Sequence, residues 1–205
     1  MHSPILAAVL ALALTPALAA AATWSEIGDA GNTIAGAQTT AGTGPLTAIQ
    51  GQLVTDLDVD LYCIRVTDPA QFSASLACVE FSNNDLWLFD AAGLGVAHND
   101  GCTGGQTNVG TPLVTTPGVY YLAISPNHSE AWNAANNPIW MPGPAGMQRS
   151  PDGPGAPGPL VSWGGPGVVS NFNNYTVQIS GGATFCEVAT PVTASTWGRT
   201  KTLYR

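Results

Sequence analysis

The sequence has few charged residues and very few basic ones. Only 9% of its 205 residues are charged, and five are Lys or Arg, so the formal net charge is −8. Proteins that bind nucleic acid rely on Lys and Arg to neutralise phosphates, so we expect no nucleic-acid partner. The scarcity of charge does not indicate disorder, because 45% of the residues are hydrophobic and disordered chains are poor in such residues.

Long apolar segments are also lacking, except near the start of the chain. The run from Ile5 to Leu14 is apolar throughout and is followed by Pro16 and a series of small residues. A bilayer-spanning helix needs about 20 residues, so the run is too short to span a membrane. Its pattern is typical of a secretory signal peptide, which we prefer to the alternative of a buried helix. We expect residues 1–22 to be removed, leaving a secreted or cell-surface chain without a transmembrane segment.

After the signal peptide, no segment repeats apolar residues with the period of a helix. Short apolar segments instead alternate with turns rich in the 24 Gly and 16 Pro. This pattern predicts an all-β fold, a jelly-roll-like antiparallel β-sandwich of about eight strands. The expected strands are Leu46–Val54, Asp58–Ile64, Phe72–Val79, Leu86–Phe89, Leu94–His98, Pro112–Thr116, Val119–Ile124 and Tyr175–Ile179.

Three of these segments carry more specific expectations. Asp58–Ile64 alternates apolar and polar residues, which predicts a half-buried strand, whereas Leu86–Phe89 is continuously apolar, as in a strand covered on both faces. Pro117–Gly118 between two strand-like segments predicts a hairpin. The chain then divides into a signal peptide (1–22), an irregular lead-in (23–45), the sandwich (46–186) and a C-terminal tail (187–205). A long loop rich in Pro, Gly and Trp interrupts the sandwich at residues 126–169.

The four cysteines predict two disulfides in an exported chain. None of their spacings resembles that of a zinc site. Three pairings are possible. Strand direction favours Cys78 with Cys102, since both lie at the same edge of neighbouring strands, and this leaves Cys63 for Cys186.

Asp56, Asp58 and Asp60 follow one another at alternate positions, so a regular strand would place all three carboxylates on one face. Like charges this close are stable when a cation such as calcium bridges them. The alternative is that Asp58 and Asp60 accept backbone hydrogen bonds where the strand begins. A second group, Asp90, Asn99 and Asp100, lies in turn sequences, and we interpret it as structural.

Six short segments together resemble the bacterial pre-peptidase C-terminal domain in their order and spacing. They are Asp58–Tyr62, Phe72–Ser75, Asp85–Asp90 with Gly93, Asn99–Asp100, Pro117–Leu122 and Tyr175–Val177. The resemblance implies a β-sandwich that accompanies secreted enzymes and is not itself catalytic. Some relatives hold calcium through the lead-in and the Asp-x-Asp strand, which here implies Glu26 and Asp29 together with Asp58 and Asp60. The final residues, Ser195–Arg205, resemble a short tail of other exported bacterial proteins that would suit surface attachment. The alternative is an ordinary frayed terminus.

The tryptophans of the long loop are the candidate ligand-binding residues. Exposed rings of Trp132, Trp140 and Trp163 would stack on sugars or anchor a protein, so the expected partner is an extracellular protein or a polysaccharide. The alternative is that these rings pin the loop to the sandwich. We expect no enzyme, because only His98 and His128 remain after signal removal and no nucleophile motif surrounds Ser129. A secreted hydrolase is the least favoured hypothesis.

Overall fold

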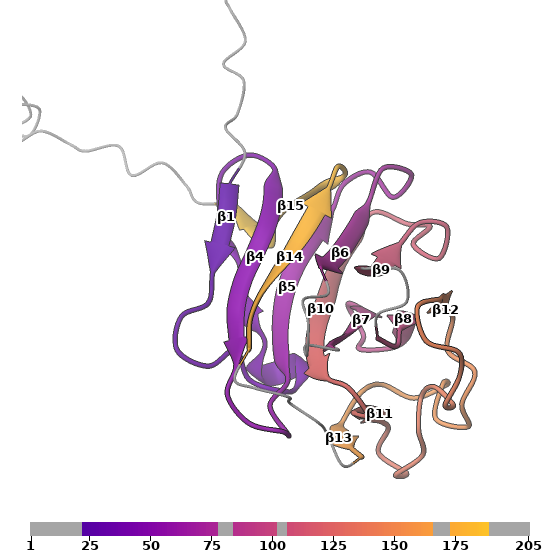
Figure 1. Cartoon of the computed structure of the whole chain (residues 1–205). Helices are drawn as coiled ribbons and strands as arrows, with labels where there is room; N and C mark the ends of the chain where they lie inside the picture. The colour runs from indigo at the N-terminus through magenta and orange to yellow at the C-terminus, as the bar shows by residue number, and fades with distance from the viewer. Residues whose placement is uncertain (1–21, 78–83, 102–105, 166–172, 189–205) are drawn as a thin grey trace, which may run out of the picture.

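The computed structural model describes residues 22–77, 84–101, 106–165 and 173–188 (Figure 1). The expected signal peptide before Ala22 and the tail after Val188 lie outside these residues. Within the described residues the fold is all-β, as predicted, with one short 3-10 turn, η1 (Ile34–Gly36). No helix in this part of the chain has the length and hydrophobicity needed to cross a membrane.

Two sheets pack face to face as a sandwich. The first has the order β1 (Ala22–Ser25), β4 (Leu46–Leu53), β14 (Asn173–Ser180), β6 (Ser73–Ala77) and β9 (Gln106–Gly110). The second has the order β12 (Gln148–Arg149), β8 (Gly95–Asn99), β7 (Asn84–Asp90), β10 (Gly118–Pro126), β5 (Asp60–Val66) and β15 (Ala183–Phe185), with β2 (Gln38–Thr39) also paired to β5.

Eight of the described strands have five or more residues, and their arrangement is that of a jelly roll. In chain order, these eight strands are β4, β5, β6, β7, β8, β9, β10 and β14, and they can be numbered 1 to 8. Side by side in the first sheet lie strands 1, 8, 3 and 6, and in the facing sheet strands 5, 4, 7 and 2. Two Greek keys folded onto each other give this order, which confirms the predicted fold class.

The main core fills the space between the sheets. Side chains at alternate positions of each strand point into it, as the period of a strand requires. Tyr62 and Ile64 on β5 meet Val177 on β14 and Ile49 on β4, all with less than 1% of their surface exposed. Apolar burial of this kind is the main driving force for folding.

A second apolar cluster lies on the outer side of the second sheet. Leu61 on β5 and Trp87 and Phe89 on β7 pack there against Trp140 and Leu160 of the long loop. The loop contains the small sheet of β11 (Glu130–Trp132) and β13 (Ser162–Gly164). The prediction of a half-buried strand after Asp58 is therefore wrong: both faces of β5 are buried because the loop covers the outer one. The prediction that Leu86–Phe89 is covered on both faces is confirmed.

The predicted hairpin around Pro117–Gly118 is wrong. β10 pairs with β5 and β7, and the segment before it is a turn. The amides of Leu113 and Val114 both donate to the carbonyl of Gly110, so they are not available to a strand. Their apolar side chains pack against the core instead. Among the described strands of five or more residues, the one that the sequence did not predict is β9, which pairs with β6.

The lead-in is more regular than its composition predicts. β1 runs parallel to β4 in the first sheet, and β2 runs parallel to β5 in the second. β3 (Ala41–Gly42) pairs with β16 (Glu187–Val188). Cys63 and Cys186 form the expected disulfide, with 5.5 Å between their Cα atoms and 123 residues between them in sequence. The second predicted pair, Cys78 and Cys102, lies outside the described residues.

Candidate metal centre

A chain of hydrogen bonds joins the two sheets at the end of the sandwich where β5 begins. The Tyr175 hydroxyl on β14 donates to Oδ2 of Asp60 on β5 at 2.6 Å. The hydroxyls of Tyr62 and Tyr175 are also 2.6 Å apart. A phenol has one hydrogen to donate, so Tyr62 donates to Tyr175. Asp60 and Tyr62 are two residues apart on one strand, which points both side chains between the sheets.

The Asp60 carboxyl is fully buried, and its second oxygen lacks a protein partner. Its relative exposure is 0%, and Oδ1 has no hydrogen-bond partner in the structure. Burial raises the pKa of Asp60 from 3.8 to about 8, and the charges of Glu26 and Asp58 raise it as well, while the bond from Tyr175 opposes them. A buried carboxylate is costly unless a cation or hydrogen bonds compensate it. A proton shared with the Glu26 carboxyl, whose hydrogen bond to Asp60 also raises the pKa, or a cation would satisfy Oδ1.

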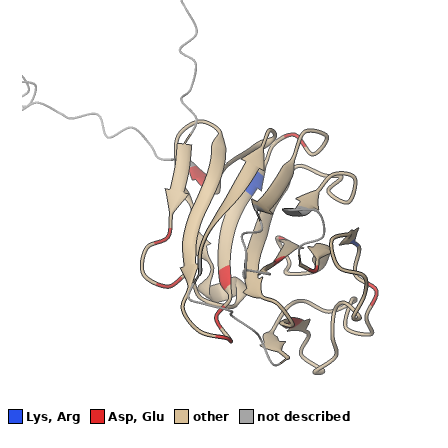
Figure 2. Ribbon diagram, in the orientation of Figure 1, with Lys and Arg blue, Asp and Glu red and all other residues tan. Residues whose placement is uncertain are grey.

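The lead-in brings two further carboxylates to Asp60. Glu26, just after β1, is held by backbone amides, with Oε1 accepting from Ala30 at 3.0 Å and Oε2 from Gln52 at 2.8 Å. Oδ1 of Asp29 accepts from the amide of Gly31 at 3.2 Å. Figure 2 shows acidic positions in the loop after β1 and at the end of the sandwich where β5 begins. Two separate segments of chain thus bring their carboxyl groups together.

These three carboxylates could hold a metal ion. One ligand oxygen each of Glu26, Asp29 and Asp60 lies within 4.8 Å of the other two. Calcium binds carboxylate oxygens at about 2.3–2.6 Å, so oxygens this far apart can share one ion. A complete shell of six to eight oxygens leaves room for the remaining carboxylate oxygens and water. The donor set of hard oxygens favours calcium over a transition metal.

Asp58 plays a different part from the other predicted ligands. Its Oδ2 accepts from the amide of Val54 at 2.6 Å, closing the turn between β4 and β5. Burial raises its pKa, and the charge of Asp29 adds to this. The hydrogen bond is the structural role that the sequence left open for Asp58, and its charge still acts on Asp60. Of the four predicted ligands, the structure brings three together and sets Asp58 beside them.

Gly51 on β4 makes room for this centre. A Cβ atom at this position would overlap the Tyr175 hydroxyl and would lie 2.7 Å from Oε2 of Glu26. Gly51, Glu26 and Tyr175 all line a surface hollow of about 490 Å³. Of the three acidic groups, Glu26 lines this hollow.

Sequence reasoning missed the two tyrosines. Tyr62 lies two residues from Asp60, so its face was predictable, and Tyr175 occupied a recognised strand. Their pairing depends on β5 and β14 facing each other across the sandwich, which no local pattern encodes. The turn residue Asp90 behaves as expected, with Oδ1 accepting from the amides of Ala92 and Leu94.

The three loop tryptophans have different surroundings. Trp140 is 4% exposed and packs edge-on against Trp87 and Phe89, so it offers little face for stacking on a sugar. Trp163 packs against the same two rings, and its Nε1 donates to the Asn32 carbonyl at 2.7 Å. These contacts pin the loop to the sandwich.

Trp163 and Trp132 are only partly buried. Trp163 lines a groove of about 450 Å³ together with Leu57 and Val161. Nε1 of Trp132 donates to Glu130 at 3.1 Å. Of the three rings predicted to bind a ligand, Trp163 lines this groove, and Trp140 lines a smaller pocket beside His98.

Fold and site define a jelly-roll β-sandwich with a cluster of acidic groups between its N-terminal segment and β5. No protein-family model matches the chain, and a search of curated proteins gives no match either.

Proposed function

We propose that this protein is an exported, non-enzymatic β-sandwich module of the pre-peptidase C-terminal type, in which calcium fastens the N-terminal segment to the sandwich. The observation that carries the proposal is the convergence of Glu26, Asp29 and Asp60, with one oxygen of each within 4.8 Å of the others, at a buried carboxyl whose Oδ1 receives no hydrogen bond from a protein donor. In this role the protein binds or presents an extracellular partner rather than catalysing a reaction.

Calcium would act here as a structural clamp. Glu26 and Asp29 belong to the loop after β1, whereas Asp60 begins β5 in the other sheet. An ion shared by these residues would tie the lead-in to both sheets. It would also supply the positive charge that the buried Asp60 carboxylate lacks, so binding and folding stability would be coupled.

The hydrogen bonds around the centre support a structural role rather than a catalytic one. The backbone amides of Ala30 and Gln52 fix Glu26, and Tyr175 fixes Asp60. Such supporting hydrogen bonds orient ligands for an ion. A shared calcium ion would suit an extracellular module, because calcium is abundant outside cells and would keep the N-terminal segment ordered.

The test is calcium binding by the purified protein and by Asp60→Asn. Isothermal titration of the wild-type protein with calcium should show one site per chain, and saturating calcium should raise the melting temperature by several degrees relative to EDTA. Asp60→Asn should lose both effects, because a neutral amide replaces the buried ligand. Magnesium should be the weaker ion, since it demands a stricter octahedral geometry.

Asp68→Asn is the matched control, because Asp68 is an exposed carboxylate that accepts the amide of Ala70 in a turn beyond the other end of β5. It should bind calcium like the wild-type protein. Absence of calcium heat together with an unchanged melting temperature in the wild-type protein would overturn the proposal. An equal calcium effect in Asp60→Asn would place the site elsewhere.

A further inference from the structure

A second polar pocket lies where the long loop covers the second sheet, away from the acidic centre. We call it the His98 pocket; it is lined by Asp85, His98, Asp100, Glu130, Trp140 and Arg149, among others. His98 at the end of β8 is only 4% exposed, yet neither Nδ1 nor Nε2 has a hydrogen-bond partner in the protein. Two buried nitrogens without partners are costly, and they mark the place where a ligand would bind.

The imidazole of His98 is held rigidly. Its ring stacks on Trp87 with 3.5 Å between ring centroids and an interplanar angle of 10°. Trp140 meets the same ring edge-on at 5.6 Å. Trp87 is itself fixed by a hydrogen bond from Nε1 to Oγ of Ser125 at 2.8 Å. The aromatic contacts hold the plane of the ring and leave its polar edge unused.

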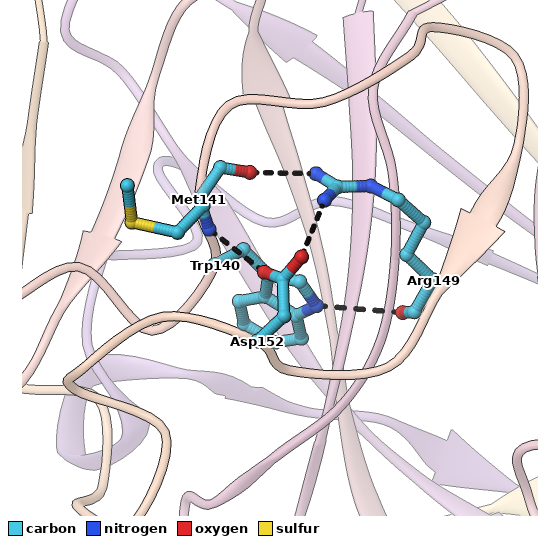
Figure 3. Close-up of polar contacts among 4 residues, drawn as sticks. All are labelled: Trp140, Met141, Arg149 and Asp152. Atoms are coloured by element: carbon cyan, nitrogen blue, oxygen red, sulfur yellow. Dashed lines mark hydrogen bonds and ion pairs between the residues drawn. The ribbon is translucent and has the colours of Figure 1, made fainter.

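Arg149 is the cross-strand neighbour of His98 on β12, and its side chain is held by an ordered set of contacts (Figure 3). Nη1 of Arg149 donates to Oδ2 of Asp152 at 3.0 Å, and Nη2 donates to the carbonyl of Met141 at 2.9 Å. The Met141 amide in turn donates to Oδ1 of Asp152 at 2.8 Å, and Nε1 of Trp140 donates to the Arg149 carbonyl at 3.4 Å. Nε of Arg149 remains buried without a partner. The pocket thus has a fixed shape and a third unused polar atom.

The pocket lining carries charges of both signs, with Arg149 paired to Asp152 and the carboxyl groups of Asp100 and Glu130 nearby. The positive charge of Arg149 acts on His98, where it adds to burial in lowering the pKa of the imidazole to about 3. A cation at His98 would face that charge. An anion would meet the carboxyl groups of Asp100 and Glu130. Asp85 is also buried, and burial, reinforced by the charge of Asp100, raises the pKa of its carboxyl well above the usual value, while the hydrogen bond from the Gly101 amide opposes this.

The size of the pocket also argues against a single ion. Its volume is about 150 Å³, the space of about five water molecules at roughly 30 Å³ each. Among the described residues, only Glu26, Asp29 and Asp60 bring three potential metal ligands within 4.8 Å of one another. Sites for drug-sized ligands are larger, at about 300–1,000 Å³. The pocket volume therefore suits a ligand with a single small ring and several polar groups.

We propose that the His98 pocket binds one neutral sugar ring, such as the end of an extracellular polysaccharide. A neutral imidazole offers one donor and one acceptor, Arg149 offers a donor, and the carboxyl groups of Asp100 and Glu130 offer acceptors. Paired hydroxyls of a sugar match this mixture, and Trp140 supplies an apolar wall. This assigns a ligand class to the binding role and does not depend on calcium.

The test is saturation-transfer NMR with the purified protein and a panel of neutral monosaccharides: glucose, galactose, mannose, xylose and N-acetylglucosamine. Glucuronate and glucosamine serve as the charged counterparts, and zinc tests for a metal site. We expect at least one neutral sugar to bind with a dissociation constant near 1 mM, more tightly than its charged counterpart. Quenching or shift of tryptophan fluorescence should accompany binding, because Trp87 and Trp140 adjoin the pocket.

Two variants remove the polar groups, and a third shifts the wall. His98→Phe keeps the ring and removes both nitrogens, and Asp100→Asn removes a carboxylate. In Gly143→Ala the new Cβ would lie 2.5 Å from Cζ of Arg149 and displace the guanidinium. Each should weaken sugar binding at least tenfold, whereas Asp68→Asn should leave it unchanged. If His98→Phe fails to fold, the other two variants still decide the outcome.

Measurements in calcium and in EDTA separate this proposal from the calcium clamp, since sugar binding should persist in folded protein without the ion. The proposal is overturned if no sugar in the panel binds, if a charged counterpart binds more tightly, or if the variants bind as the wild type does. Binding of zinc that is lost in His98→Phe would also overturn it and make the pocket a metal site.

Discussion

The hydroxyl of Tyr175 and Oδ2 of Asp60 lie 2.6 Å apart and join the two sheets of the sandwich. Both groups are buried, and Tyr62 extends the contact into a chain of three polar side chains within an otherwise apolar core. Polar groups in such a place require mutual satisfaction, because each one left unpaired costs free energy of folding. The chain therefore links the stability of the sandwich to the state of the acidic centre.

Tyr175→Phe should destabilise the protein by roughly 1–3 kcal/mol, because it leaves the Asp60 carboxyl and the Tyr62 hydroxyl without their partner. Tyr62→Phe should cost less, since Asp60 keeps its bond from Tyr175. Urea denaturation in EDTA measures the free energy of unfolding of each variant. Equal losses for the two tyrosines would contradict this order of importance.

In the metal-free protein, the contribution of Asp60 to stability should fall as the pH rises from about 4 to about 8. The pKa of Asp60 is raised from 3.8 to about 8, so the folded state holds a proton over this interval that the unfolded state has lost. The stabilising contribution is complete below pH 4 and disappears as the pH passes 8. Its slope is at most about 1.4 kcal/mol per pH unit.

The difference between the wild-type protein and Asp60→Asn isolates this effect from other titrating groups, Asp85 among them. Unfolding free energies of both proteins in EDTA, measured at intervals from pH 4 to pH 8, should diverge in favour of Asp60→Asn as the pH rises. In saturating calcium the wild-type protein should instead be stabilised at the upper end. Parallel curves in EDTA would show that Asp60 does not titrate in this range.

Gly51→Ala should weaken calcium binding and destabilise the fold, because its Cβ would overlap the Tyr175 hydroxyl and crowd Glu26. Gly118→Ala is the matched control, since a Cβ there meets nothing within 4 Å. Both glycines lie in strands, so any general effect of alanine on a strand is shared. Calorimetric titration and thermal melting should separate the two variants, and similar behaviour in both would contradict the role given to Gly51.

The sequence predicted the strands better than the contacts between them. Alternation and turn residues located β4, β5, β7, β8, β10 and β14 to within a few residues. The predicted partnership of Glu26 and Asp29 with Asp60 came from a family resemblance and agrees with the geometry. Local patterns carry no signal for contacts across the sandwich, so the tyrosine pair was not foreseen.

The His98 pocket escaped prediction for a related reason. His98 ended a strand and Asp100 began a turn, and nothing in either segment indicated that the long loop would fold back over them. The loop closes against the sheet partly because Gly95 leaves space for it. A Cβ at Gly95 would lie 2.5 Å from Cη2 of Trp140 and 2.8 Å from Cγ of Pro151.

As the pH falls below 6.5, the free energy of unfolding should decrease less in His98→Phe than in the wild-type protein. Burial, aided by the charge of Arg149, lowers the pKa of His98 from 6.5 to about 3. Below pH 6.5 the unfolded state therefore takes up a proton that the folded state does not bind. The contribution of His98 to stability is complete above pH 6.5 and falls as the pH approaches 3.

The other titratable or charged groups lining the pocket are Asp85, Asp100, His128, Glu130 and Arg149. They are retained in the variant, so the difference between the two unfolding curves from pH 7 to pH 4 reports His98 itself. The wild-type protein should lose up to about 1.4 kcal/mol more than the variant for each pH unit below 6.5. Identical slopes would mean that His98 is protonated in the folded protein, which would also remove the neutral imidazole that sugar recognition requires.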